Sequence, residues 1–205
     1  PKANWMNDPN GLVYHNGQWH LFYQHNPWGN RWGHMSWGHA VTRDLVHWAH
    51  QPIALYEEPT KGSSDSTMIF SGSAIVDKGN RARICPTGTQ DCMVAFYTSH
   101  IEGKVQHQSL AYSPDGGATW SKYDKNPIID LDNKDFRDPK VFWHQATQKW
   151  VMAVNLPTEH KVLFYGSTNL TEWTKLSEFG GIGDISKNWE CPDLIPLRVA
   201  NEPGV

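Results

Sequence analysis

Residues 167–173 read STNLTEW, and similar stretches occur at two earlier places in the chain. Residues 113–120 read SPDGGATW, and residues 42–48 read TRDLVHW. Each stretch combines a polar turn with a tryptophan, and each ends a short strand-like segment. A turn that returns with the same tryptophan after the same kind of strand indicates that the chain is built from repeats.

Two further strand-like runs precede each of these turns and are close enough in sequence to pair. Convincing helical periodicity is absent, so the sequence predicts an all-β fold. The turns HNGQ and HQATQK join the first and third pairs as hairpins. The pairs are 11–14 with 18–24, 73–76 with 92–98, and 140–143 with 149–154.

The repeats begin near residues 7, 70 and 137, and a fourth begins with ECPDLIPL at 190–197. Units of this size made of short antiparallel strands are typical of β-propeller blades. A β-sandwich is the alternative, but it is not expected to repeat the same order of strand, turn and tryptophan. Three blades and part of a fourth cannot close a ring, so we expect residues 1–205 to be one incomplete propeller domain.

Polar residues open each repeat. The innermost strand of a blade lines the central channel, so these residues should converge at one mouth of it. Two carboxylates around a bound sugar are the minimum equipment for glycoside hydrolysis, and here three are expected to share one pocket. The opening pairs are Asn7-Asp8, Phe70-Ser71, Arg137-Asp138 and Glu190-Cys191.

Each carboxylate also has an ordinary structural explanation. Asp8 lies in NDPNG, which is a turn-forming sequence, and Asp138 precedes a proline and can pair with Arg137. An isolated Glu190 is typical of a solvated surface acid. Their recurrence at the start of successive repeats favours a site over these explanations.

The composition argues against some partners. The net charge is −3 and the isoelectric point is about 6.4, which does not favour nucleic acid or an anionic membrane. No apolar run approaches the roughly 18 residues that span a bilayer.

The 11 tryptophans suit a protein that stacks aromatic rings on the flat faces of sugars, and packing in the core is the alternative explanation. Pro1 is not a natural initiator, so we expect that upstream sequence has been lost or removed.

Two features favour an extracellular protein. Cys85 and Cys92 bracket a short loop and allow a disulfide, although a chance pair fits equally well. Asn169-Leu170-Thr171 is a possible glycosylation sequon.

Paired histidines in 34–39 and 47–50 raise the question of a metal site. Strand spacing does not place both rings on one face reliably, and no cysteine or carboxylate completes a zinc set, so no metal site is expected.

Four motifs, in order along the chain, are similar to those of the invertase, inulinase and levanase family of β-fructofuranosidases, glycoside hydrolase family 32. The resemblance runs through the whole chain, and details outside the motifs look most like microbial exo-inulinases and levanases. It implies a five-bladed propeller followed by a β-sandwich domain, and no cofactor. The motifs are WMNDPNG (5–11), FSGSA (70–74), FRDPKVF (136–142) and WECPDL (189–194).

The resemblance also implies roles for individual residues. Asp8 is implied to be the nucleophile, Glu190 the general acid and then base, and Asp138 a residue that holds fructose hydroxyls and steadies the transition state. Cys191 is implied to tune the surroundings of Glu190. The positions matched around the fructosyl ring are Asn7, Gln24, Trp32, Phe70, Ser71 and Arg137.

The chemistry of these residues agrees with such roles. A retaining mechanism needs two carboxyl groups about 5–5.5 Å apart. Arg137 beside Asp138 indicates that this acid is held ionised, and Trp189 with Cys191 gives Glu190 a less polar setting. The sequence therefore predicts an exo-acting, retaining β-fructosidase that releases fructose from inulin, levan or sucrose.

Other functions stay open at this level. A fructosyltransferase would share the chemistry but use another sugar as acceptor in place of water. A fructan-binding module or inactive fragment is the alternative outside catalysis, motivated by the missing blades. Related arabinan- or xylan-cleaving propellers also use three carboxylates, but WMNDPNG and WECPD argue against them.

Overall fold

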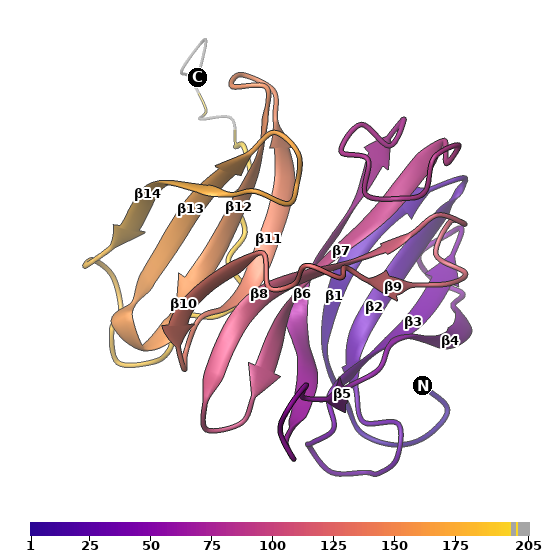
Figure 1. Ribbon diagram of the computed structural model, residues 1–205, viewed down its shortest axis with the longest axis horizontal. Helices are drawn as coiled ribbons and strands as arrows, with labels where there is room; N and C mark the ends of the chain where they lie inside the picture. The colour runs from indigo at the N-terminus through magenta and orange to yellow at the C-terminus, as the bar shows by residue number, and fades with distance from the viewer. Residues whose placement is uncertain (198–199, 201–205) are drawn as a thin grey trace.

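The computed structural model describes residues 1–197 and residue 200 of the chain. It confirms the all-β fold, because the strands form three antiparallel sheets that follow one another in sequence (Figure 1). The last residues of the predicted domain, 198–199 and 201–205, lie outside the described part. A ring of five blades and a further sandwich domain stay predictions.

Each sheet contains a meander of neighbouring strands. Sheet 1 has the order β1 (Met6–His15), β2 (Gln18–His25), β3 (Ser36–Thr42), β4 (Ala49–Leu55). Sheet 3 has the order β11 (Arg137–His144), β12 (Lys149–Leu156), β13 (Lys161–Ser167), β14 (Thr174–Gly180), with a 3-10 turn at Pro157–Glu159.

Sheet 2 lies between the other two and has extra short strands at both edges. Its central meander is β6 (Ser66–Lys78), β7 (Asp91–Ile101) and β8 (Val105–Ser113). The short strands are β5 (Glu58–Pro59), which pairs with β6, and β9 (Ser121–Lys122) and β10 (Ile129–Asn133), which both pair with β8.

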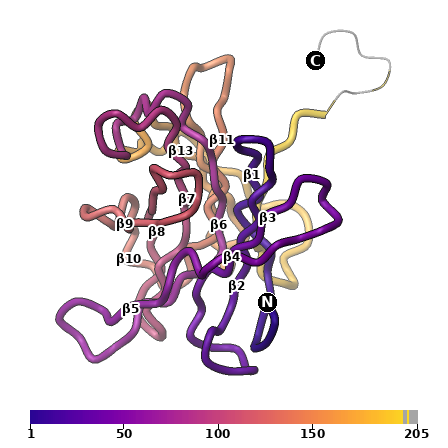
Figure 2. The backbone as a smooth tube through the Cα atoms, turned by 90° about the vertical axis from the view of Figure 1, so that its right-hand side faces the viewer, coloured from indigo at the N-terminus to yellow at the C-terminus, as the bar shows by residue number. Residues whose placement is uncertain are grey.

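The first long strand of each sheet lies toward the middle of the molecule. Strand β6 packs against both β1 and β11, and the three are seen close together in two views at right angles (Figures 1 and 2). The start of each sequence repeat is thereby placed next to the start of the following one. This arrangement brings together residues that are about 65 positions apart in the chain.

The repeated turn has the same hydrogen bonds in all three sheets. A hydroxyl at the end of the third long strand donates to an Asp or Asn side chain two residues later, and backbone N–H groups of the turn donate back to the hydroxyl. The pairs are Thr42 with Asp44, Ser113 with Asp115, and Ser167 with Asn169.

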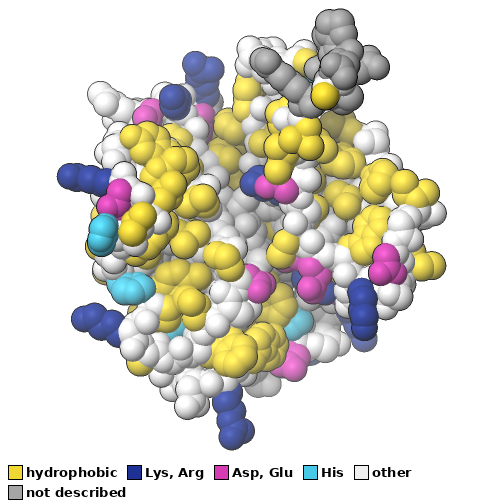
Figure 3. All heavy atoms as spheres, turned by 180° about the vertical axis from the view of Figure 1, so that it is seen from behind, with side chains coloured by type: hydrophobic (Ala, Val, Ile, Leu, Met, Phe, Trp, Pro, Cys, Tyr) yellow, Lys and Arg dark blue, Asp and Glu magenta, His cyan; other side chains and the backbone are white. Residues whose placement is uncertain are grey.

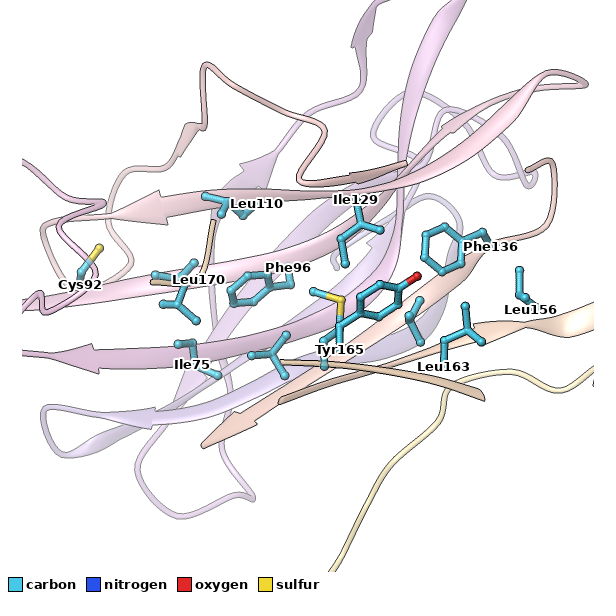
Figure 4. Packing of buried hydrophobic residues seen from close by; sticks show 14 of the residues in the cluster. Ile75, Cys92, Phe96, Leu110, Ile129, Phe136, Leu156, Leu163, Tyr165 and Leu170 are labelled. Carbon is cyan, nitrogen blue, oxygen red and sulfur yellow. The ribbon is translucent and has the colours of Figure 1, made fainter. Parts of the chain in front are cut away.

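The repeated tryptophans join neighbouring sheets. Trp173 meets Phe96 of sheet 2 edge-on with ring centroids 6.0 Å apart, and Trp120 meets Phe22 of sheet 1 in the same way at 5.3 Å. Each indole N–H is bonded to a carbonyl within its own turn. Phe96 lies in the larger of the two apolar clusters, which fills the space between sheets 2 and 3 (Figure 4). The structure thus gives two of these tryptophans a packing role.

Two local predictions are confirmed by the geometry. Asn16 and Gly17 join β1 to β2, and both have positive φ, at 47° and 82°, as a type I′ hairpin turn requires. Cys85 and Cys92 form a disulfide, which settles the question that their spacing left open.

The inner strands begin earlier than predicted, so the site motifs lie within strands and not in preceding turns. The register of each strand with its neighbour shifts between Met6 and Pro9 in β1, between Phe70 and Gly72 in β6, and between Arg137 and Lys140 in β11. A bulge of this kind re-aims side chains locally while the strand continues. Pro9 and Pro139 are tolerated because they lie at these irregular positions.

The fourth repeat does not form a strand in the described residues. Residues 190–197 follow β14 without strand pairing. The start of a fourth blade therefore stays a prediction, and the segment reaches the middle of the molecule. Lys140 on β11 holds it there through an ion pair with Asp193 at 2.8 Å.

Candidate active site

A cavity of about 390 Å³ lies where the motif segments meet. It draws residues from β1, β2, β6, β7, β8 and β11, together with Trp32 and the segment that carries Glu190. All nine residues that the sequence predicts to be catalytic or substrate-binding line it. They are Asn7, Asp8, Gln24, Trp32, Phe70, Ser71, Arg137, Asp138 and Glu190, and the lining is completed by His100, Gln106 and Cys191.

Asp8 is exposed to the cavity and is held by the neighbouring sheet. Ser71 of β6 donates from its hydroxyl to Oδ2 of Asp8 at 3.0 Å. Asn7, beside it, is fixed by the indole N–H of Trp5, which donates to its Oδ1 at 2.7 Å. Both side chains therefore present polar atoms to the cavity from the bulged part of β1.

Asp138 is buried, with 7% of its surface exposed, and its φ of 66° lies in the left-handed region. Its Oδ2 accepts the backbone N–H of Cys191 at 3.0 Å, and its own N–H donates to the hydroxyl of Thr98 at 3.0 Å. These two bonds fix the carboxyl group at the junction of sheets 2 and 3. A non-glycine residue held in this conformation is uncommon and is a feature of functional sites.

The electrostatics of Asp138 differ from the expectation drawn from Arg137 alone. Burial raises the pKa of Asp138 above its ordinary value, while the N–H of Cys191 and the charge of Arg137 oppose that rise. The nearby carboxylates of Glu190 and Asp8 add to it. Arg137 lowers the pKa of Asp138, as its position beside the acid suggests, but desolvation is the larger influence. That Asp138 is held ionised stays a prediction.

Arg137 connects the carboxylates of two repeats. Its Nη2 donates to Oε1 of Glu190 at 2.9 Å, and its Nη1 donates to Asp135. The side chain of Glu190 is 57% exposed, so the less polar, enclosed setting inferred from Trp189 and Cys191 is absent here. The indole of Trp189 turns away and stacks near Phe179 instead.

Aromatic rings form one wall of the cavity. Phe70 lies parallel to His100 with centroids 4.2 Å apart, and Trp32 meets Phe70 at 6.1 Å. Polar groups complete the lining. Gln24 is 2% exposed, and its Nε2 has no hydrogen-bond partner among the residues that the structure describes. A buried amide donor without a partner in a cavity is suited to a ligand oxygen.

His100 and Gln106 were not found from the sequence. They lie on β7 and β8, which carry no motif, and they reach the cavity only through the pairing of β7 with β6 and of β8 with β7. Gln106 binds both His100 and the backbone N–H of Phe136. The local sequence contains no pattern that indicates them as site residues, because the apolar-aromatic run of β7 predicts only a buried strand.

The thiol of Cys191 is unreactive although it lies in the cavity wall. Desolvation at the cavity wall, together with the charges of Asp138, Asp8 and Glu190, raises the pKa of Cys191 to about 12. The thiol therefore stays protonated at neutral pH and is a poor nucleophile. Its backbone N–H, which binds Asp138, is its clearest contribution to the site.

The histidines of the two paired segments have other partners. Nδ1 of His34 contacts the carboxylate of Glu57, His39 binds His20 at 3.1 Å, and Nδ1 of His47 contacts the carboxylate of Asp44. Within residues 1–197, no group of three histidine, cysteine or acidic side chains is arranged to hold a metal ion. The same part of the chain has no helix that is long and apolar enough to cross a membrane.

Asn169 of the sequon occupies a structural position. Its Oδ1 accepts the N–H groups of Thr171 and Glu172, and its Nδ2 donates to Glu172 at 3.0 Å. It is the equivalent of Asp44 and Asp115 in the other repeats. The repeated turn thus explains this asparagine without glycosylation.

Comparison with known proteins gives one consistent picture. The family model "Glycosyl hydrolases family 32 N-terminal domain" matches residues 1–205. A levanase from Bacillus subtilis is 53% identical over the whole chain, which covers 29% of that enzyme. An extracellular exo-inulinase from Aspergillus awamori is 44% identical over 96% of the chain, which covers 40% of the enzyme.

A solved structure shares the fold as well as the sequence. The fructofuranosidase from Schwanniomyces occidentalis, solved in complex with fructose, superposes with a TM-score of 0.89 at 41% identity. The match covers 99% of this chain and 40% of that one. The chain therefore spans less than half the length of each of these three relatives.

Proposed function

The chain belongs to glycosyl hydrolase family 32, and from this membership we propose that it carries the catalytic carboxylates of a retaining β-fructofuranosidase. The substrates are β-fructofuranosides such as inulin, levan or sucrose, and the product is fructose. The observation that carries the proposal is the meeting of Asp8, Asp138 and Glu190, from three separate motifs, in one cavity.

The first step is displacement at the anomeric carbon of the fructosyl unit. The Asp8 carboxylate attacks that carbon, and the bond to the leaving-group oxygen breaks while Glu190 gives its proton to that oxygen. The hydrogen bond from Ser71 aims one oxygen of Asp8, which leaves the other free to react. The product of this step is a covalent fructosyl-enzyme.

Water completes the reaction. Glu190, now ionised, takes a proton from a water molecule, whose oxygen attacks the same carbon and releases Asp8. Nη2 of Arg137, which lies 2.9 Å from Oε1 of Glu190, positions this carboxyl group and stabilises its ionised form in the second step. Two displacements at one carbon return the original configuration, so the fructose is released as the β-anomer.

The remaining lining residues hold the sugar. Asp138 accepts hydroxyl hydrogens and opposes the positive charge that develops on the ring in the transition state. The unpartnered Nε2 of Gln24 donates to a sugar oxygen, and Trp32 and Phe70 cover the apolar face of the ring. This set of contacts favours a single terminal fructosyl unit, as in exo-acting cleavage.

An extracellular location is part of the proposal. It is supported by the disulfide between Cys85 and Cys92 and by the extracellular exo-inulinase among the relatives.

The test is fructose release by the full-length protein and its Asp8→Asn variant. We expect the wild type to release fructose from sucrose and inulin, and the variant to lose at least roughly 10²–10⁴ of kcat, the range of an acid–base step. Asp124→Asn, an exposed acid outside the cavity, is the matched control and should keep full activity. Equal rates for the wild type and Asp8→Asn contradict the proposal.

The same assay separates hydrolysis from transfer. High sucrose should still yield mainly free fructose and glucose by chromatography, whereas a dominant yield of fructo-oligosaccharides identifies a fructosyltransferase. Tight fructan binding with no turnover by the full-length wild type identifies a binding protein instead.

A further inference from the structure

His100 lies in the wall of the cavity and has no part in the two displacement steps. It belongs to β7, and its ring is held parallel to Phe70 with centroids 4.2 Å apart. Its Nδ1 is 3.1 Å from Nε2 of Gln106. No other hydrogen bond of the ring is found among the described residues, so its second nitrogen, Nε2, is available to a ligand.

The orientation of the Gln106 amide is fixed by the backbone. Its oxygen accepts the N–H of Phe136 at 2.9 Å, and Nη1 of Arg137 approaches the same oxygen at 3.4 Å. Both of these groups are donors only, so they require the amide oxygen and not the nitrogen. The nitrogen of Gln106 must therefore be the atom that faces His100.

This orientation decides the tautomer of His100. An amide nitrogen donates and does not accept, so Nδ1 of His100 is the acceptor and carries no proton. The proton of the neutral ring is then on Nε2. Burial lowers the pKa of His100, and Arg137 acts in the same direction while Glu102 opposes it, so the ring is neutral at pH 7.

We propose that His100 is a sugar-binding residue whose Nε2–H donates to a hydroxyl oxygen of the bound fructoside, and that Gln106 is the positioning residue that keeps the proton on Nε2. The inference rests on the proposed function and adds a neutral donor to the aromatic wall. The Phe70 ring prevents the imidazole from turning away, so the donor stays directed by two independent contacts.

The first test is His100→Phe in the full-length protein. Phenylalanine keeps the ring against Phe70 but removes the donor. We expect kcat/KM for sucrose to fall roughly 2- to 12-fold, the size of one neutral hydrogen bond, mainly through KM. His107→Phe is the matched control, because His107 is half-buried in the adjacent strand β8 outside the cavity, and its kcat/KM should stay within about twofold.

The second test uses Gln106→Glu and the pH profile of kcat/KM. A carboxylate accepts from Nδ1–H, so it raises the pKa of His100 and moves the proton of the neutral ring to Nδ1. The variant should therefore lose affinity as pH rises through that pKa, when Nε2–H is lost. The charged groups around His100 are Glu102 and Arg137, with Asp8, Asp138 and Glu190 across the cavity.

This loss at high pH should appear as an additional alkaline limb in the pH profile of kcat/KM for Gln106→Glu. The limb should vanish in the double variant His100→Phe/Gln106→Glu, because that variant has no imidazole at position 100 to titrate. The inference is overturned if His100→Phe matches the wild type, if Gln106→Glu shows no such limb, or if the limb persists in the double variant. Failure of the proposed function looks different, because the wild type itself would then release no fructose.

Discussion

Asp138 combines a left-handed backbone conformation with a carboxylate that is almost completely buried. Each property costs free energy, of order 1–3 kcal/mol for the backbone alone. The surrounding bonds to Cys191 and Thr98 hold the residue in place but do not remove these costs. Such a residue is expected where function, and not stability, has determined the side chain.

Asp138→Asn should separate stability from activity. Asparagine tolerates the left-handed conformation and still offers Oδ1 to the N–H of Cys191. It removes the charge needed at the transition state, so we expect kcat for sucrose to fall by about 10²–10³. The thermal midpoint at pH 7 should rise by about 2–4 °C, as measured by circular dichroism.

The sign of the stability change follows from the raised pKa of Asp138. The folded state binds the proton more tightly than the unfolded state, so the wild type loses stability as pH rises above 3.8 and through the folded pKa. The advantage of the variant should therefore shrink as the pH is lowered toward 3.8. Asp135→Asn is the control, because it removes a partner of Arg137 and should lower the midpoint.

The sequence predicted which motif residues share the cavity, because each one marks the start of a repeat. His100 and Gln106 could not be found in this way. Their placement depends on the pairing of β7 with β6 and of β8 with β7, which is a property of the sheet and not of the local sequence. The desolvation of Asp138 was missed for a similar reason, since burial arises from three sheets at once.

At the scale of elements, prediction failed mainly at the ends of the inner strands. NDPNG and RDP contain residues that usually interrupt strands, yet β1 and β11 run through them by means of register shifts. A bulge is compatible with proline and with positive φ, so the same residues satisfy both a turn and a bulged strand. Only the neighbouring strand decides between the two.

The junction of sheets 1 and 2 contains a buried pair of histidines that should make the fold sensitive to acid. His39 is 3% exposed, stacks on Phe22 at 4.6 Å and binds His20 at 3.1 Å. Burial and the neighbouring His20 lower the pKa of His39 to about 3, and burial with His15 lowers that of His20. Protonation of these rings is therefore opposed in the folded state.

We expect the free energy of unfolding to fall as pH drops below about 6.5, where the unfolded state gains protons that the folded state does not. For His39 alone the loss at pH 4.5 is about 2–3 kcal/mol. Urea unfolding of the full-length protein at pH 7 and pH 4.5 measures this loss. His39→Gln should reduce the loss of free energy of unfolding between pH 7 and pH 4.5. A loss equal to that of the wild type would contradict the assignment to His39. The exposed His144→Gln should leave the loss unchanged.

At the scale of the whole molecule, the row of three sheets leaves an apolar face uncovered at each end. On sheet 3, Phe179 is 48% exposed and borders a groove that is also lined by Val162, Phe164 and Trp189. On sheet 1, Leu12 and Tyr14 of β1 are exposed. Hydrophobic side chains are visible over several areas of the surface (Figure 3). Contiguous apolar surface of this kind marks an interface.

Residues 1–205 expressed alone should therefore self-associate. We expect size-exclusion chromatography to show species larger than the 23.3 kDa chain, together with strong binding of a hydrophobic dye. Phe179→Ser should weaken both signals in the isolated chain because it removes part of the exposed face. In the full-length protein the same substitution should instead lower the free energy of unfolding by about 1–3 kcal/mol, because the lost side chain is then covered. A monomeric isolated chain that binds no dye, or a full-length protein that tolerates Phe179→Ser without loss, would show that this face is not an interface within the protein.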